Sequence, residues 1–101
     1  IYQRKEENMR SYELTVIVRP KESEALIAKV KDILQKHNVT IEKDESWGNK
    51  KLAYEVSNET EGYYMFLHVQ TTPETVKKII SDFRLDSNIL RYLFVQQKKS
   101  A

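Results

Sequence analysis

The sequence contains no cysteine among its 101 residues. Disulfides, cysteine-ligated zinc sites and thiol nucleophiles are therefore excluded. Glycine is almost as scarce: Gly48 and Gly62 are the only two, so the chain has no glycine-rich loop that would cradle a phosphate. Neither a GxSxG nor an HExxH signature is present. A search for catalytic motifs therefore returns nothing.

Long apolar runs and a strong excess of charge are also missing. No stretch approaches the roughly 20 apolar residues that cross a bilayer, and residues 1–10 are charged rather than apolar like a signal segment. The formal net charge is +2 and the pI is about 8.8. This balance is too weak to indicate a nucleic-acid partner, because binding also depends on where the charges cluster. Composition fits a cytoplasmic protein and leaves the partner open.

The residues that are present suit one small globular domain. A chain of 101 residues is long enough for one modest core and too short for two. Hydrophobic residues make up 40% of the chain and include three Phe, six Tyr and one Trp, while 32% of the residues are charged. We therefore expect one core with a well-solvated surface.

Period-two alternation of apolar residues predicts four strands. The first covers Tyr12 to Arg19 and stops at Pro20. The second runs from Val39 to Val56, with a bend or bulge at Gly48. The polar stretch 57–62 reads as a hairpin connection to a third strand over residues 63–69, which is apolar on both faces. Residues 89–95 form the last predicted strand.

Two segments show helical periodicity. Between Glu22 and His37 the apolar side chains recur every three or four residues, and Asn38 can adopt the left-handed conformation that ends helices. The second helix begins with Thr72 as N-cap and Pro73 at its first position. Its apolar stripe consists of Val76, Ile79, Ile80 and Phe83.

The element order predicts an α+β domain of the ferredoxin-like βαββαβ type. Such a domain has a four-stranded antiparallel sheet, and right-handed crossovers place both helices on one face of it. The opposite face is then free to meet solvent or a partner. Alternation along the third strand directs Tyr63, Met65, Leu67 and Val69 to the helices and Tyr64, Phe66 and His68 outward.

Two outward aromatic side chains on one strand need an explanation. Either neighbouring side chains cover them in part, or they form a binding surface. The third strand of an RNA-recognition module begins with a basic residue and presents exposed rings, whereas this strand follows Glu61 and has Met65 at a ring position. Contact with a protein partner through Tyr64 and Phe66 fits better.

The remaining polar residues do not indicate a catalytic or metal site. His37 and His68 are too few and too scattered for metal binding, and we assign neither a role. The acidic run Glu42, Asp44 and Glu45 reads as the solvated face of a strand. We predict no catalytic residue, metal or cofactor. Two rival functions of this topology remain, a ligand-binding or protein-interaction module and a small enzyme.

Three segments resemble the bacterial ribosomal small-subunit protein six family. Residues 9–13 (MRSYE) look like its start, residues 47–54 (WGNKKLAY) with 62–64 (GYY) resemble its central hairpin pattern, and residues 88–92 (NILRY) resemble its last strand. The family usually has Pro after the LAY triplet, where this chain has Glu55. The resemblance covers residues 9 to about 98, so we expect the domain over 9–97 and a polar tail over 98–101, while residues 1–8 are an N-terminal extension or reflect a different start site.

The resemblance implies a structural protein of the small ribosomal subunit that is not an enzyme. It also implies binding to small-subunit (16S) ribosomal RNA as a heterodimer with small-subunit protein eighteen. Basic positions of the family pattern correspond to four RNA-contact candidates: Arg10, Lys50, Lys51 and Arg91. A solvated charged rim is the alternative for each of them. Cations of this kind contact phosphates and set position rather than read bases.

Overall fold

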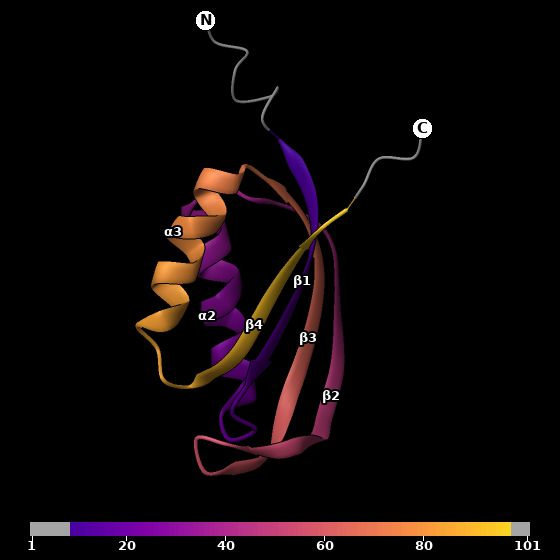
Figure 1. Ribbon diagram of the computed structural model, residues 1–101, viewed down its shortest axis with the longest axis vertical. Helices are drawn as coiled ribbons and strands as arrows, with labels where there is room; N and C mark the ends of the chain where they lie inside the picture. Colours follow the sequence, from indigo (N-terminus) through magenta and orange to yellow (C-terminus); the bar gives the residue numbers. More distant parts are fainter. Residues whose placement is uncertain (1–8, 98–101) are drawn as a thin grey trace, which may run out of the picture.

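In the part of the chain that the structure describes, six elements follow one another in the predicted order. They are β1 (Arg10–Val18), α2 (Ser23–Lys36), β2 (Thr40–Val56), β3 (Glu59–Thr71), α3 (Pro73–Arg84) and β4 (Ile89–Gln96). The computed structural model describes residues 9–97 (Figure 1). The predicted N-terminal extension, residues 1–8, and the polar tail, residues 98–101, lie outside the described residues.

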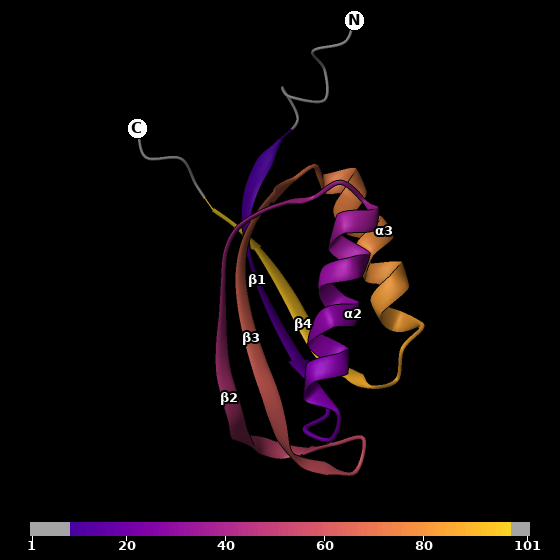
Figure 2. The ribbon, with the colours of Figure 1, turned by 180° about the vertical axis from the view of Figure 1, so that it is seen from behind.

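The four strands form one antiparallel sheet in the order β2-β3-β1-β4. Both helices lie on the same face of this sheet, as the two opposite views show (Figures 1 and 2). The first and last strands are therefore neighbours, and the backbone N–H of Gln97 donates to the carbonyl of Ser11 at 2.8 Å. This arrangement confirms the predicted ferredoxin-like α+β fold.

The core lies between the sheet and the helices. Alternate residues of the two central strands point into it, beginning with Tyr12 on β1 and continuing on β3 with Met65. Burial raises the pKa of the Tyr12 phenol. Within residues 9–97, the largest fully buried side chains are Leu14, Val16, Val18, Val30, Leu34, Met65, Leu67, Val69, Ile79 and Phe83. The predicted facing of the third strand is confirmed, since Tyr64, Phe66 and His68 alternate with these core residues and are half-buried on the far face.

Local signals set the helix ends. The Thr72 side chain accepts a hydrogen bond from the Thr75 N–H at 3.2 Å, so it caps α3 as predicted, with Pro73 following. Asn38 has φ 60° and ends α2 in the left-handed conformation. Next to it, His37 Nε2 lies 2.7 Å from the Asp82 carboxylate and links the end of α2 to α3.

The β2–β3 hairpin departs from the prediction in one respect. The connection is the two-residue turn Ser57-Asn58, and β3 begins at Glu59, so assigning residues 59–62 to a loop was wrong. Both turn residues have positive φ, 50° and 67°, the backbone of the tight hairpin turn whose twist matches the strands. Gly62 is therefore an interior strand residue, opposite Lys50 on β2.

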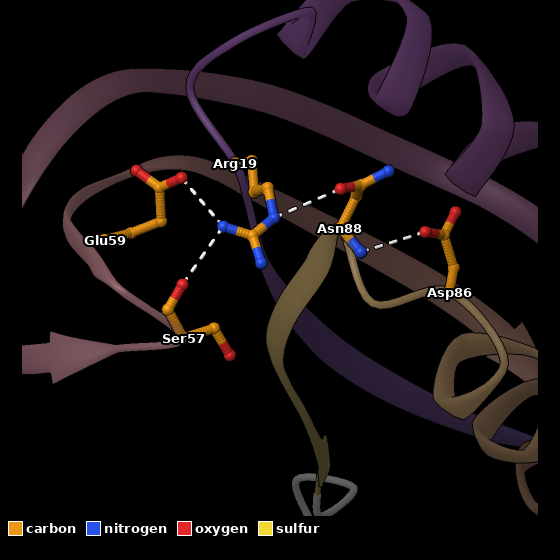
Figure 3. A network of polar contacts seen from close by, with 5 residues as sticks. All are labelled: Arg19, Ser57, Glu59, Asp86 and Asn88. Carbon is orange, nitrogen blue, oxygen red and sulfur yellow. Dashed lines mark hydrogen bonds and ion pairs between the residues drawn. The ribbon is translucent and has the colours of Figure 1, made fainter.

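Arg19, just after β1, fastens the hairpin tip to the start of β4 (Figure 3). Its Nη1 donates to the Ser57 carbonyl at 3.1 Å and pairs with the Glu59 carboxylate at 2.8 Å. Its Nε donates to Asn88 Oδ1 at 3.1 Å, while the Asn88 N–H donates to Asp86 Oδ1 at 2.9 Å. Three connections of the fold therefore converge on one guanidinium group.

Candidate functional site

The sheet face away from the helices, called the open face below, carries aromatic and apolar side chains. The strand register aligns them in rows: Phe66 on β3 lies beside Thr15 on β1, which lies beside Leu93 on β4. In the next row Tyr64 lies beside Ile17, and Ile17 beside Arg91. Leu93 is 59% exposed and Val95 is 45% exposed. A surface of this kind is suited to a partner that excludes water from it.

Three rings on the open face form what we call the aromatic cluster, Trp47, Phe66 and His68. The Trp47 and Phe66 rings are stacked, with centroids 5.1 Å apart and planes 13° apart. His68 meets Phe66 edge-on at 5.2 Å. Offset stacks and edge-on contacts are the favourable geometries for aromatic pairs. These two contacts link Trp47, Phe66 and His68 into one continuous aromatic surface.

A β-bulge places Trp47 in this cluster. Ser46 pairs with Met65 and Gly48 pairs with Tyr64, so Trp47 between them is the extra residue of β2. Gly48 has φ 82°, a conformation that favours glycine. The alternation of apolar residues along 39–56 predicted a bulge at Gly48 but indicated no role for the residue before it. Because a bulge redirects side chains, the Trp-Gly pair inside a strand was the signal that could have identified Trp47.

Charged neighbours surround the exposed indole of Trp47. Its Nε1–H donates to Glu45 Oε1 at 3.0 Å, and Lys43 Nζ pairs with Glu45 Oε2 at 3.0 Å. The Trp47 hydrogen bond, followed by the Lys43 contacts, holds the pKa of Glu45 below its ordinary value. Lys50 Nζ lies 5.6 Å from the centre of the Trp47 ring, within the range of a cation–π contact.

Tyr54 and Arg91 form a second aromatic and cationic pair. The Arg91 guanidinium lies 5.4 Å from the Tyr54 ring centre, and Arg91 Nη2 donates to Tyr54 Oη at 3.0 Å. These residues belong to β2 and β4, the two edges of the sheet. They meet because the far end of the β2–β3 hairpin turns across one end of the sheet (Figures 1 and 2).

The described residues do not bring together the side chains of a metal site. Within residues 9–97, no group of three or more His, Asp and Glu side chains is placed to hold a metal ion. In that same part of the chain, no helix combines the length and the apolar character that a membrane crossing requires. The His37 and Asp82 contact joins the two helices on the side of the sheet opposite the open face.

Comparison with known proteins decides the family. The model of the ribosomal protein S6 family matches residues 11–96, nearly all of the described domain. The chain belongs to the ribosomal protein S6 family. The small ribosomal subunit proteins bS6 of two Leptospira biflexa serovar Patoc strains are each 36% identical to it over 88 residues, which are 87% of this chain and 97% of theirs.

Solved structures agree with this assignment. The crystal structure of 30S ribosomal protein S6 from Thermotoga maritima is similar with a TM-score of 0.79 and 26% identity, covering 88% of each chain. The C-terminal domain of the MgtC protein from Mycobacterium tuberculosis shares the fold with a TM-score of 0.62, 15% identity and 90% coverage of each chain. Membership of the S6 family makes this chain a structural constituent of the small ribosomal subunit, in the cytoplasm with the ribosome, and not an enzyme.

In this S6 family chain, the four predicted RNA-contact residues do not form one cluster. Lys50 and Arg91 lie on the open face, whereas Lys51 alternates to the other face, opposite Glu61. Arg10 begins β1 at the opposite end of the sheet from Arg91, paired with Thr71, and its Nη1 donates to the Met9 carbonyl at 3.1 Å. Two of the four cations therefore share a face with the predicted partner-contact residues.

Proposed function

We propose that this S6 family chain binds small-subunit (16S) ribosomal RNA together with small-subunit protein eighteen, and that the open face takes the protein partner. The observation that carries the proposal is the aromatic cluster on a sheet face that neither helix covers. Tyr64 and Phe66 are the contact candidates, and Trp47 extends the same surface. Desolvated aromatic side chains are common anchors of protein interfaces.

The RNA contacts in this proposal are electrostatic. Arg10, Lys50, Lys51 and Arg91 each offer a cation to phosphate, and the exposed Lys50 and Arg91 lie beside the proposed partner surface. An RNA segment that follows the edge of the bound partner would then meet these two cations. Phosphate contacts release condensed counterions, so affinity should fall steeply as salt rises.

Filter binding of 16S ribosomal RNA with saturating protein eighteen, measured over a range of salt concentrations, tests the proposal. We expect a negative slope of log affinity against log salt concentration. Each phosphate contact should contribute roughly 0.7 to 0.9 to the magnitude of this slope. Arg91→Ala should reduce that slope by about one contact and leave the thermal midpoint nearly unchanged. A salt-independent affinity would contradict the electrostatic contacts, and a large fall in thermal midpoint would mean that Arg91 is structural.

Tyr64→Ala/Phe66→Ala tests the partner surface separately. Truncating interface anchors costs about 2 kcal/mol or more, which corresponds to roughly thirtyfold in affinity for protein eighteen. Lys78→Ala, an exposed residue on α3 in the opposite layer, is the matched control. Unchanged partner affinity in the aromatic double variant would place the partner elsewhere.

A further inference from the structure

Tyr54 is more exposed than Trp47, and like Trp47 it is held by a cation–π contact and a side-chain hydrogen bond. The Tyr54 residue is 62% exposed, yet Arg91 contacts it twice, through the ring face and through the hydroxyl. A ring with two such contacts has few conformations to lose when something binds it. Preorganisation of this kind lowers the entropic cost of binding.

The backbone on both sides of this pair is also fixed. Three residues after Tyr54, the Ser57 carbonyl accepts from Arg19, and Glu59 pairs with the same guanidinium (Figure 3). Arg19 also holds Asn88, three residues before Arg91. The hairpin and the start of β4 are therefore joined at one point, and this joint keeps the ring and the cation facing each other.

The chemistry around the ring favours a nucleotide over a protein side chain. Arg91 uses one of its five N–H donors on the Tyr54 hydroxyl, and its guanidinium carries further donors that suit phosphate oxygens. Lys50 lies on the same strand and the same face as a second cation. Glu61 lies opposite Lys51, on the other face, whereas the residue opposite Lys50 is Gly62.

We propose that the exposed face of the Tyr54 ring, held by Arg91, stacks an unpaired base of the bound RNA. Single-stranded RNA is recognised by such stacking, which tolerates any base because every base has a π-face. Arg91 then holds a phosphate that flanks that base. This inference rests on the proposed RNA binding and adds a contact to it that is not electrostatic. It also gives Arg91 two roles, as a phosphate contact and as the residue that positions the ring.

The experiment measures 16S ribosomal RNA binding by the wild type and Tyr54→Leu, each with saturating protein eighteen, across the same salt series. Loss of one stacked base should lower affinity by between about fivefold and about 150-fold. The slope against salt should stay the same, because no phosphate contact is removed. Tyr54→Trp should bind within about twofold of the wild type, since its ring also stacks. Leu85→Ala, at the exposed end of α3, is the control and should bind as the wild type does.

Each alternative result has a distinct meaning. Equal RNA affinity of Tyr54→Leu and the wild type overturns the stacking inference and leaves the proposed function intact. A wild type that does not bind the RNA overturns both. If Tyr54→Leu instead weakens the binding of protein eighteen in the absence of RNA, the ring is a protein contact and the inference is wrong. Tyr54→Phe keeps the ring and removes the hydroxyl. If the Phe and Leu variants show the same fall in thermal midpoint and both lose RNA affinity, Tyr54 has a structural role and the stacking inference is wrong.

Discussion

Gly62 on β3 lies directly against Ile17 on β1, and a Cβ atom at position 62 would overlap with Ile17 Cγ2. Gly62→Ala should therefore destabilise the domain by about 1 to 3 kcal/mol through overpacking, as measured by urea unfolding. Ile17→Ala removes the atom that overlaps. The cost of Gly62→Ala should be clearly smaller in that background, and equal costs in the two backgrounds would mean that the two residues do not interact.

The two faces of β3 should respond differently to truncation. Leu67 is fully buried, so Leu67→Ala should cost about 2 to 5 kcal/mol of unfolding free energy through lost burial and a cavity. Tyr64→Ala/Phe66→Ala should cost much less unfolding free energy and should instead weaken binding of the proposed partner. Thermal unfolding of each variant alone, beside binding to protein eighteen, separates the effects. If the aromatic pair lowers stability as much as Leu67→Ala while binding is unchanged, the open face is not an interface.

Arg19→Ala should loosen the hairpin tip more than the rest of the domain. It removes contacts to Ser57, Glu59 and Asn88, and hydrogen bonds of charged groups contribute about 1.5 to 3 kcal/mol each where they are well shielded. Since the Arg19 side chain is partly exposed, we expect a total loss near the lower value. Hydrogen exchange should quicken in residues 50–61 and stay slow in β1. Uniform exchange across the sheet would contradict a local role.

Low pH should weaken the ion pairs that join α2 to α3 and to the residues just after α3. Hydrogen bonds from His37, then from Lys36, lower the pKa of Asp82, and the hydrogen bond from Lys29 lowers the pKa of Asp86. A carboxyl group whose folded pKa is lowered stabilises the fold above its unfolded pKa of about 3.9, and that stability is lost as pH falls through the folded value. Urea unfolding should therefore show falling stability below about pH 4.

Asp86→Asn isolates one contribution to this acid dependence. The Asp86 carboxylate is largely covered and lies 2.6 Å from Lys29 Nζ, so the variant should lose about 1 kcal/mol at pH 7 and less at pH 2. Asp32→Asn, an exposed position on α2, should lose little at either pH. An Asp86→Asn deficit that is the same at both pH values would exclude the ion pair as its cause.

Sequence patterns predicted the architecture because burial repeats with a fixed period along each element. Leu14, Val16 and Val18 alternate because one face of β1 meets the helices, and the same period predicted how β3 is oriented. Thr72 and Pro73 marked the start of α3 through local backbone chemistry alone. Such signals are contained in a few neighbouring residues, so they can be interpreted without knowing the tertiary structure.

The features that sequence analysis missed depend on pairing between distant segments. Ser57-Asn58 is a less common tight-turn pair than Asn-Gly, so the polar run and Gly62 suggested a longer loop. Trp47 reaches Phe66 only because a bulge shifts the register, and Tyr54 reaches Arg91 only because the hairpin crosses the sheet. No local spacing encodes either contact. The four basic candidates were likewise chosen one by one, and their separation depends on strand order.

The hydrogen bond between Gln97 and Ser11 has a practical consequence for handling the domain. It brings the two ends of the described chain together at one pole of the sheet, while the Ser57-Asn58 turn occupies the other. Domains with adjacent ends tolerate circular permutation, and an exposed turn is a suitable place for new ends. In a permuted chain opened between Ser57 and Asn58, the turn would no longer connect β2 to β3. Fluorophores attached at residues 9 and 97, the ends of the described domain, would report from the pole opposite the Ser57-Asn58 turn.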